Sequence, residues 1–325
     1  MTPCTLAVDV GGSAVKMGYS TPDGRVHGIR SVSVAAIKSR GDVVTGIIDE
    51  IQSALVSAPE HLSPVSVGLV VPGNVDEAAG VGRLSLILGW RDVPFVTLVS
   101  EATNLPVGFG HDVCAGATAE GRLGAARGHT DWLFIALGTG LGSAFMLSGR
   151  HYRGSNGYGG ELSHVITIED GPLCRCGKRG CLEMLASASA ISARYTQAAQ
   201  EPEPVTAAEV GQRLRQGDQL AAKVWSEAVA ALATVVAGYC ESMNPSAVVV
   251  GGGVAESGDL LFQPLRAQLD GRIRYADVPV IHPAALGQLA GLHGAALLGL
   301  EAAGADIQLQ GQTSSQVRVT EGDSR

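Results

Sequence analysis

Apolar runs rich in β-branched residues recur along the chain, and each adjoins a cluster of glycines. The runs LAVDV (6–10), LFIAL (133–137) and AVVV (247–250) predict buried strands. Helical periodicity lies between them, at 42–57, 113–124 and 219–242. Strands that alternate with helices predict an α/β protein.

The chain contains an internal similarity at long range. Residues 6–26 predict a strand, a Gly turn, a strand, a PDG turn and a strand, and residues 133–151 repeat the first part of this pattern. Two such segments predict two related domains that face each other, each beginning with a β-meander. A chance likeness between two Gly-rich hairpins is the alternative.

Length and charge limit the classes of protein to consider. A chain of 325 residues with 46% apolar content has room for two domains. A net charge of −8 argues against a nucleic-acid or anionic-membrane surface. We expect the start, MTPCTLAVDVGGS, to be neither a signal peptide nor an anchor, and we expect no membrane span, because no apolar run approaches the roughly 20 residues that one needs. We therefore expect a cytoplasmic protein with reduced cysteines.

Two of the glycine clusters have the composition of phosphate-binding turns. In VDVGGSAVK (8–16), Asp9 ends a strand and precedes Gly11, Gly12 and Ser13. Glycines let backbone N–H groups approach phosphate, and a carboxylate there can hold Mg²⁺ through water. A tight hairpin with an incidental acid would give the same local sequence. The turn LGTGLGS (137–143), in the second half of the repeat, favours the phosphate interpretation.

A candidate catalytic acid precedes a helix of small residues. In HDVCAGATAE (111–120) this acid is Asp112. A kinase that acts on an alcohol needs a carboxylate to orient the hydroxyl and accept its proton. The alternative is that Asp112 is a helix N-cap, a position that Asp favours. The two roles are compatible.

Three cysteines and a histidine are spaced as a metal site. His164 is followed by Cys174, Cys176 and Cys181, which together form a Cys₃His set typical of structural zinc. An odd number of cysteines disfavours a disulfide, and redox-active thiols lack their usual CxxC pattern. The other cysteines are expected to be buried small residues: Cys4, Cys114 and Cys240.

These motifs together resemble the ROK family of bacterial sugar kinases and transcriptional repressors. GYGGELSH (157–164) followed by CRCGKRGCLE (174–183) is similar to the family signature, and the likeness covers roughly residues 4–300. It implies an actin-like ATPase fold, a doubled ribonuclease-H-like α/β architecture with two domains around a central cleft. The expected domains are 1–110, completed by a helix at 287–304, and 111–286, followed by a polar tail at 306–325.

The resemblance also implies roles for individual residues. Asp112 would be the general base that acts on the sugar hydroxyl, and the expected cofactors are ATP, Mg²⁺ and structural Zn²⁺. The residues expected to contact sugar are His111, Asp112, Glu161, His164 and Glu183. The residues expected to bind nucleotide are Asp9, Gly11, Gly12, Ser13, Lys16, Gly138, Thr139, Gly140, Gly251, Gly252 and Gly253. A sharp turn is the alternative role for the last three. The resemblance further implies a homodimer.

Four positions depart from the family pattern. Ile87 stands at the sugar-loop asparagine, His111 at the asparagine before the base, Ser163 at a glycine and Gly160 at an alanine. Changing polar recognition groups can shift specificity strongly, because buried partners lose their hydrogen bonds. We therefore expect phosphorylation of the 6-hydroxyl of glucose or of a close analogue, such as the amino sugar kanosamine of antibiotic pathways.

Other functions stay open at this point. The acceptor could be a cyclitol or another hexose, such as N-acetylmannosamine, allose or fructose. The family's repressors carry a winged-helix segment before the first phosphate motif, for which the position of Asp9 leaves no room. A sugar sensor without catalysis and a polyphosphate-dependent glucokinase are further alternatives.

Overall fold

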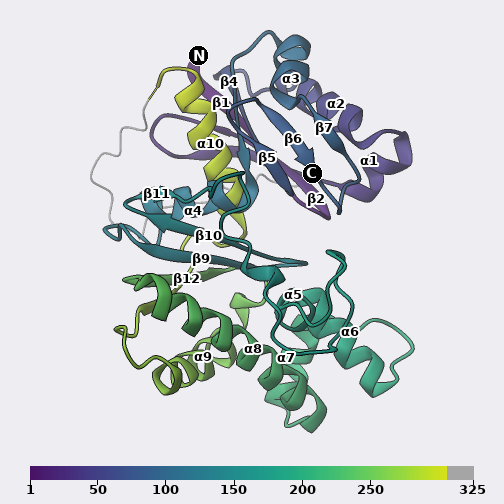
Figure 1. The fold of residues 1–325 in the computed structure, drawn as a ribbon. Coiled ribbons are helices and arrows are strands. Elements are labelled where there is room, and N and C mark those ends of the chain that lie inside the picture. The colour runs from purple at the N-terminus through teal and green to yellow at the C-terminus, as the bar shows by residue number, and fades with distance from the viewer. Residues whose placement is uncertain (306–325) are drawn as a thin grey trace. The chain divides into compact units, whose positions relative to one another are not determined.

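The chain forms two compact units, and the structure, a computed structural model, describes residues 1–305. Of the described residues, one unit contains 1–124 and 289–305, and the other spans Ala125–Gln288. Each unit contains a five-stranded mixed sheet (Figure 1). The tail expected at 306–325 lies outside the described residues.

The first unit begins with the expected β-meander. Its sheet has the order β3-β2-β1-β4-β8, in which the first three strands are antiparallel and the last two run parallel to β1. The strands are β1 (Thr2–Val10), β2 (Ala14–Ser20), β3 (Val26–Ser33), β4 (Leu62–Val71) and β8 (Val107–His111). A small antiparallel sheet, not predicted from the sequence, contains β5 (Asn74–Asp76), β6 (Val81–Leu84) and β7 (Arg91–Val93).

Helices complete the first unit, and one of them comes from the far end of the chain. They are α1 (Val34–Arg40), α2 (Val43–Val56), α3 (Phe95–Thr103), α4 (Asp112–Leu123) and α10 (Ala290–Ala302). Gly68 in β4 lets α10 lie directly on the sheet, because a Cβ there would stand 1.8 Å from the carbonyl oxygen of Ala295.

Helix α4 belongs to this unit as well. A Cβ on Gly294 of α10 would stand 2.3 Å from the backbone of Ala115 in α4. This close packing explains why the division lies at residue 124, whereas the sequence suggested a boundary at residue 111.

The second unit repeats the strand order of the first. Its sheet runs β11-β10-β9-β12-β13, again with an antiparallel meander followed by two parallel strands. The strands are β9 (Trp132–Leu137), β10 (Leu141–Leu147), β11 (Arg150–His151), β12 (Ala247–Gly251) and β13 (Val280–Pro283). The internal similarity in the sequence is therefore a repeat of topology, not a coincidence of two hairpins.

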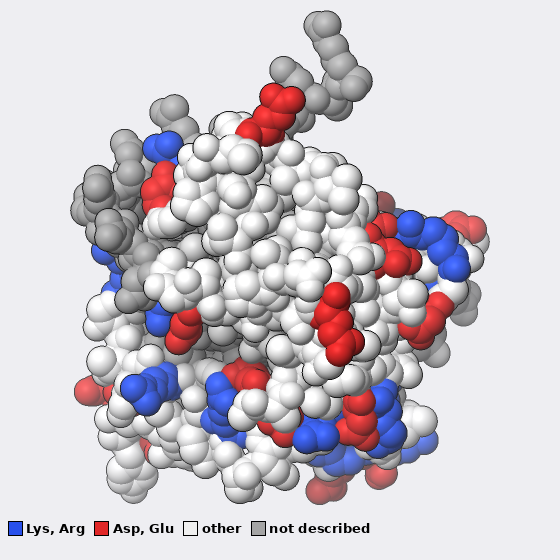
Figure 2. Space-filling view, turned by 90° about the horizontal axis from the view of Figure 1, so that it is seen from above, with Lys and Arg blue, Asp and Glu red and all other residues white. Residues whose placement is uncertain are grey.

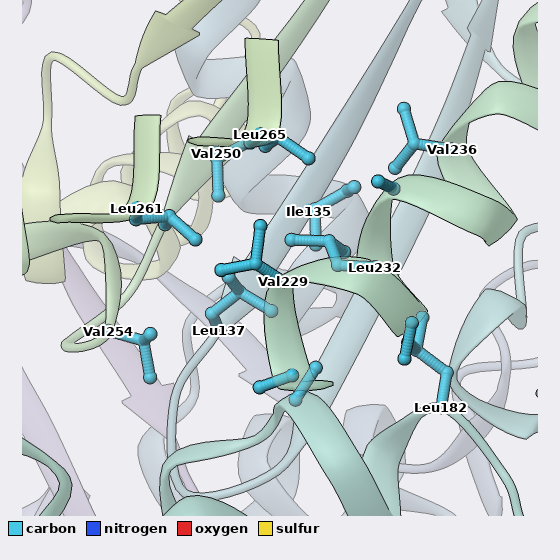
Figure 3. Close-up of a cluster of buried hydrophobic side chains, with 14 of the residues drawn as sticks. Ile135, Leu137, Leu182, Val229, Leu232, Val236, Val250, Val254, Leu261 and Leu265 are labelled. Atoms are coloured by element: carbon cyan, nitrogen blue, oxygen red, sulfur yellow. The ribbon is translucent and has the colours of Figure 1, made fainter. Parts of the chain in front are cut away.

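The core of the second unit lies between this sheet and its helices. The helices are α5 (Glu183–Ala186), α6 (Ala188–Ala199), α7 (Ala207–Arg215), α8 (Gln219–Met243) and α9 (Asp259–Arg272), with short 3₁₀ turns at Leu162–His164, Ala255–Ser257 and Gly287–Leu289. Leu137 and Val250 from the strands meet Val229 and Leu232 from α8 in this core (Figure 3).

Helix α8 corrects the expectation about membrane spans. It is long and apolar enough to cross a membrane by length and composition, and 61% of its most apolar window is buried inside the structure. Its apolar residues, among them Trp225, Leu232 and Val236, pack in the core of the second unit. The core helix of a soluble protein passes the same test, so this helix is weak evidence for a membrane.

Candidate active site and metal centre

The first phosphate-type turn connects β1 to β2. The backbone N–H of Gly11 donates to the carbonyl oxygen of Ala14 at 2.9 Å, which closes the turn. The carbonyl oxygen of Ser13 accepts from the N–H of Val34 at 2.9 Å and so ties the turn to α1. Gly12 and Ser13 are exposed at its tip. A glycine and a hydroxyl at an exposed turn are suited to close approach by a phosphate.

Two carboxylates lie at the carboxyl ends of two parallel strands, β1 and β8, which β4 separates in the sheet. Asp9 is near the end of β1, and Asp112 directly follows β8. Burial raises the pKa of Asp9 to about 7; the negative charge of Asp112 adds to this effect, and Lys16, opposite Asp9 on β2, opposes it. Ligands of open α/β sheets bind at this edge, so both acids stand where a substrate is expected.

The carboxylate of Asp112 is held by one of its oxygens. Its Oδ1 accepts from the N–H of Val113 at 2.8 Å and lies 3.3 Å from Nε2 of His111. The backbone N–H of His111 donates to Oε1 of Glu77 at 3.4 Å. The N-cap of α4 is His111 and Asp112 is its first residue, so the interpretation of Asp112 as the N-cap is wrong.

An apolar side chain lies beside the first turn. The side chain of Ile87 is 43% exposed, and its Cγ2 lies 3.0 Å from the place that a Cβ on Gly12 would take. Lys38 donates to the carbonyl oxygen of Ile87 at 3.5 Å. The structure therefore brings Ile87 to the phosphate-type turn, where it offers a methyl surface rather than a hydrogen-bonding group.

The second Gly turn adjoins a carboxylate of the second unit. The N–H of Gly138 donates to the carbonyl oxygen of Gly140 at 3.0 Å, and the carbonyl oxygen of Gly138 accepts from the N–H of Ala188 at 2.9 Å. A Cβ on Gly140 would stand 3.1 Å from Oε1 of Glu183. The turn that begins β10 and the acid at the start of α5 therefore lie in contact, while Thr139 is exposed between the two glycines.

The three glycines after β12 differ from one another. Gly252 has φ +86°, and a Cβ there would stand 2.5 Å from the backbone of Leu137. Gly251 is buried, and Gly253 is exposed with open space around it. The sharp-turn explanation therefore holds for Gly252, because neither its backbone nor its surroundings accept a side chain. A role of the three in nucleotide binding stays a prediction.

The expected metal ligands come together in the second unit. One donor atom from each of His164, Cys174, Cys176 and Cys181 lies within 4.8 Å of the others. Sγ of Cys174 is 3.6 Å from Nδ1 of His164, and Sγ of Cys176 is 3.6 Å from Sγ of Cys181. Ligands around a tetrahedral Zn²⁺ stand about 3.5–3.8 Å apart, so these residues fit the ion.

The remaining cysteines agree only in part with expectation. All six cysteines of the chain are free. Cys4 and Cys240 are fully buried, whereas Cys114 in α4 is only half-buried. The expectation of burial is therefore wrong for Cys114, which stands in the first turn of α4, before the buried residues of that helix begin at Ala115.

Three candidate sugar-binding residues lie at the metal centre, and one of them, His164, is also an expected metal ligand. Nδ1 of His164 lies 4.0 Å from Oε2 of Glu183. Burial raises the pKa of Glu183; the charges of His164 and Arg175 oppose this, and that of Glu161 adds to it. Glu161, His164 and Glu183 therefore form one cluster. Because Nδ1 is the nitrogen that faces the cysteines, it is the one that would bind a metal.

Two serines beside this cluster were not identified as site residues from the sequence. Ser143, buried in β10, accepts from the N–H of Leu162 at 3.2 Å and donates to the carbonyl oxygen of Gly160. Ser163 is 2% exposed and donates to Oε2 of Glu161 at 3.2 Å. The available signals were that Ser163 departs from the family pattern and that it stands two positions after an acid in GELSH.

Comparison with known protein families decides the classification. The model of the ROK family matches residues 5–302. The chain belongs to the ROK family. This ROK chain is 32% identical to a glucokinase of Thermotoga maritima over 81% of its length and 86% of the relative. It is also 32% identical to a kanosamine kinase of Amycolatopsis mediterranei, over 93% of its length and 98% of the relative.

A solved structure agrees with this classification. The ROK glucokinase of Streptomyces griseus, in complex with glucose and AMPPNP, has a TM-score of 0.81 and 30% identity to this chain, and the match covers 92% of this chain and 99% of the other. The actin-like ATPase fold that the sequence resemblance implied is thereby confirmed.

Proposed function

We propose that this ROK protein transfers the γ-phosphoryl group of ATP to the primary hydroxyl of a hexose or a close analogue. The observation that carries the proposal is the arrangement of Asp112. Its Oδ1 is held by Val113 and His111, so Oδ2 is the oxygen that can accept a proton. The phosphate-type turn of the same unit follows Asp9, whose carboxylate is close enough to feel the charge of Asp112.

The proposed reaction is a single displacement. Oδ2 of Asp112 orients the primary hydroxyl and accepts its proton. The hydroxyl oxygen forms a bond to the γ-phosphorus while the bond between that phosphorus and the β-bridging oxygen breaks, so that ADP leaves. The products are a sugar 6-phosphate, ADP and the proton on Asp112, which passes to solvent.

Nucleotide binding is assigned to the three Gly-rich turns. Gly11, Gly12 and Ser13 in the first unit, with Lys16, would contact phosphate, as would Gly138, Thr139 and Gly140 in the second. Gly251 to Gly253 would contact adenosine. Mg²⁺, when bound, supplies charge neutralisation at the phosphates, and Asp9 would hold it through water. A partly buried carboxylate with a raised pKa is a suitable partner for such a cation.

The zinc site is proposed to have a structural role. Four protein ligands leave no open position, and such closed sites are structural. With Nδ1 of His164 and the three cysteines as ligands, the ion would fix the loop on which Glu161 and His164 stand. Those residues and Glu183 would then bind sugar hydroxyls in a preset orientation.

The acceptor is proposed to be an analogue of glucose rather than glucose itself. Ile87 offers an apolar side chain beside the first turn, and His111 places an imidazole next to the base. Both would alter the hydrogen bonds available to the sugar. The similarity to the kanosamine kinase, over nearly the whole length of both chains, supports an amino sugar.

A panel of acceptors with ATP and Mg²⁺ tests these proposals. ADP release would be measured with glucose, 3-amino-3-deoxyglucose, N-acetylmannosamine, allose, fructose and a cyclitol, for the protein and for Asp112→Asn. We expect the unchanged protein to turn over, with a higher kcat/KM for the amino sugar than for glucose. In Asp112→Asn we expect kcat to fall by at least about 10³-fold. Near-normal turnover in Asp112→Asn would exclude it as the base.

The same panel separates the alternatives. A sensor would bind sugar without releasing ADP, and a polyphosphate-dependent enzyme would use polyphosphate in place of ATP. On the face shown in Figure 2, Lys and Arg side chains are interspersed with Asp and Glu, which gives no support to nucleic-acid binding. A homodimer and a cytoplasmic location stay predictions.

A further inference from the structure

We propose that Ser163 is a positioning residue that decides which oxygen of Glu161 faces the sugar. The proposal rests on the proposed function, because it assigns Ser163 a part in sugar recognition. The hydroxyl of Ser163 donates to Oε2 of Glu161 at 3.2 Å, and Ser163 itself is 2% exposed. The buried hydroxyl of Ser163 thus holds one carboxylate oxygen of Glu161, a residue that is itself exposed.

The backbone on both sides of Glu161 is anchored independently. Gly160 adopts φ +101°, and its carbonyl oxygen accepts from the hydroxyl of Ser143. The N–H of Leu162 donates to that same hydroxyl oxygen at 3.2 Å. Ser143 is 6% exposed in β10, so the strand fixes the residues before and after Glu161. The main chain is thereby held, and the orientation of the carboxylate depends on Ser163.

This arrangement limits what Glu161 can recognise. A carboxylate has two oxygens, and with both free it can accept from two adjacent hydroxyls of a sugar. With Oε2 held by Ser163, Oε1 is the oxygen that meets the substrate. Glu161 then recognises one hydroxyl or one ammonium group. Ser163 therefore determines specificity through Glu161, without touching the sugar.

A double-mutant cycle tests whether Ser163 acts through Glu161. We expect Ser163→Ala to lower kcat/KM for the best acceptor of the panel by about tenfold, mainly through KM, because a hydrogen bond to a charged group is lost. In a Glu161→Ala background, where no acceptor remains for the Ser163 hydroxyl, the same change should alter kcat/KM by less than about twofold. Full additivity of the two changes would overturn the proposal.

The matched control is Ser187→Ala. Ser187 is as buried as Ser163, and its hydroxyl accepts from the N–H of Ala190 at the start of α6. Its loss should lower the stability of the protein, and its effect on kcat/KM should add to that of Glu161→Ala. If Ser187→Ala departs from additivity as much as Ser163→Ala does, the cycle reports the stability of the loop rather than a contact with Glu161. That result would overturn the proposal.

A readout without turnover separates this inference from the proposed function. Crystal structures of the protein and of Ser163→Ala should show the carboxylate of Glu161 on Ser163 in the first and in another rotamer in the second. If no acceptor of the panel is phosphorylated, the proposed function fails while this comparison still tests the geometry. An unchanged Glu161 side chain in Ser163→Ala would refute the positioning role.

Discussion

The raised pKa of Asp9 makes the stability of the protein depend on pH. The carboxyl group has a pKa of about 7 in the folded protein, against an ordinary value of 3.8, chiefly because of burial. Folding therefore disfavours the ionised form of Asp9 and lowers the free energy of unfolding wherever that group is ionised in the unfolded chain. This loss of stability begins above pH 3.8 and is complete above about pH 7. Linkage gives a cost of roughly 2 kcal/mol at pH 5 and roughly 4 kcal/mol at pH 8.

Replacing Asp9 by Asn removes this dependence while preserving the shape of the side chain. We expect Asp9→Asn to gain about 2–3 kcal/mol of unfolding free energy over the parent protein between pH 5 and pH 8. This is a ceiling, because Asp9 is only half-buried and water screens part of the effect.

Denaturant unfolding at 25 °C without Mg²⁺ and nucleotide measures this difference. Comparing the two pH values cancels any change that does not depend on pH, such as a new hydrogen bond of the amide. A difference between the proteins that is the same at pH 5 and pH 8 would refute the assignment of a raised pKa to Asp9.

Three further changes are expected to separate parts of the site. Metal analysis should find about one zinc per chain. Cys176→Ser should lower that zinc content, and it should raise the KM for sugar more than it lowers kcat. A metal-free protein with full activity would contradict the zinc role. Gly252→Ala should cost at least about 2 kcal/mol of unfolding free energy, because the new side chain meets both a positive φ and a backbone clash. Gly253→Ala, which places its side chain in open space, should cost less than about 1 kcal/mol. Equal losses of the two variants in thermal unfolding would refute this. Gly140→Ala should displace Glu183 and raise the KM for sugar, so an unchanged KM would count against the contact between them.

The fold was predictable because its strands and turns have strong local signals. The runs before Gly138 and Gly251 are continuous and apolar, and the run before Gly11 is interrupted only by Asp9; this is expected for buried strands, and each appears as a strand in the structure. The small sheet of β5, β6 and β7 was missed because its strands have three or four residues. The membership of α4 in the first unit depends on its packing against α10, a contact between segments far apart in sequence.

The candidate site was predictable only where several residues share one motif. The four residues predicted to bind zinc do lie together, as the spacing of His164, Cys174, Cys176 and Cys181 in one short segment suggested. The contact of Ile87 with Gly12, the pKa of Asp9 and the bond from Ser163 to Glu161 depend on which side chains meet after folding. Such contacts leave no periodic trace in the sequence.

The central claim is that the protein phosphorylates a primary hydroxyl with Asp112 as the base. Its most direct test is to incubate the protein with ATP, Mg²⁺ and 3-amino-3-deoxyglucose or glucose, and to locate the phosphate by phosphorus–proton NMR correlation. We predict ADP and a sugar 6-phosphate in equal amounts, and neither product with Asp112→Asn. Sugar binding with no sugar phosphate from any acceptor, or phosphate at another position, would contradict the claim.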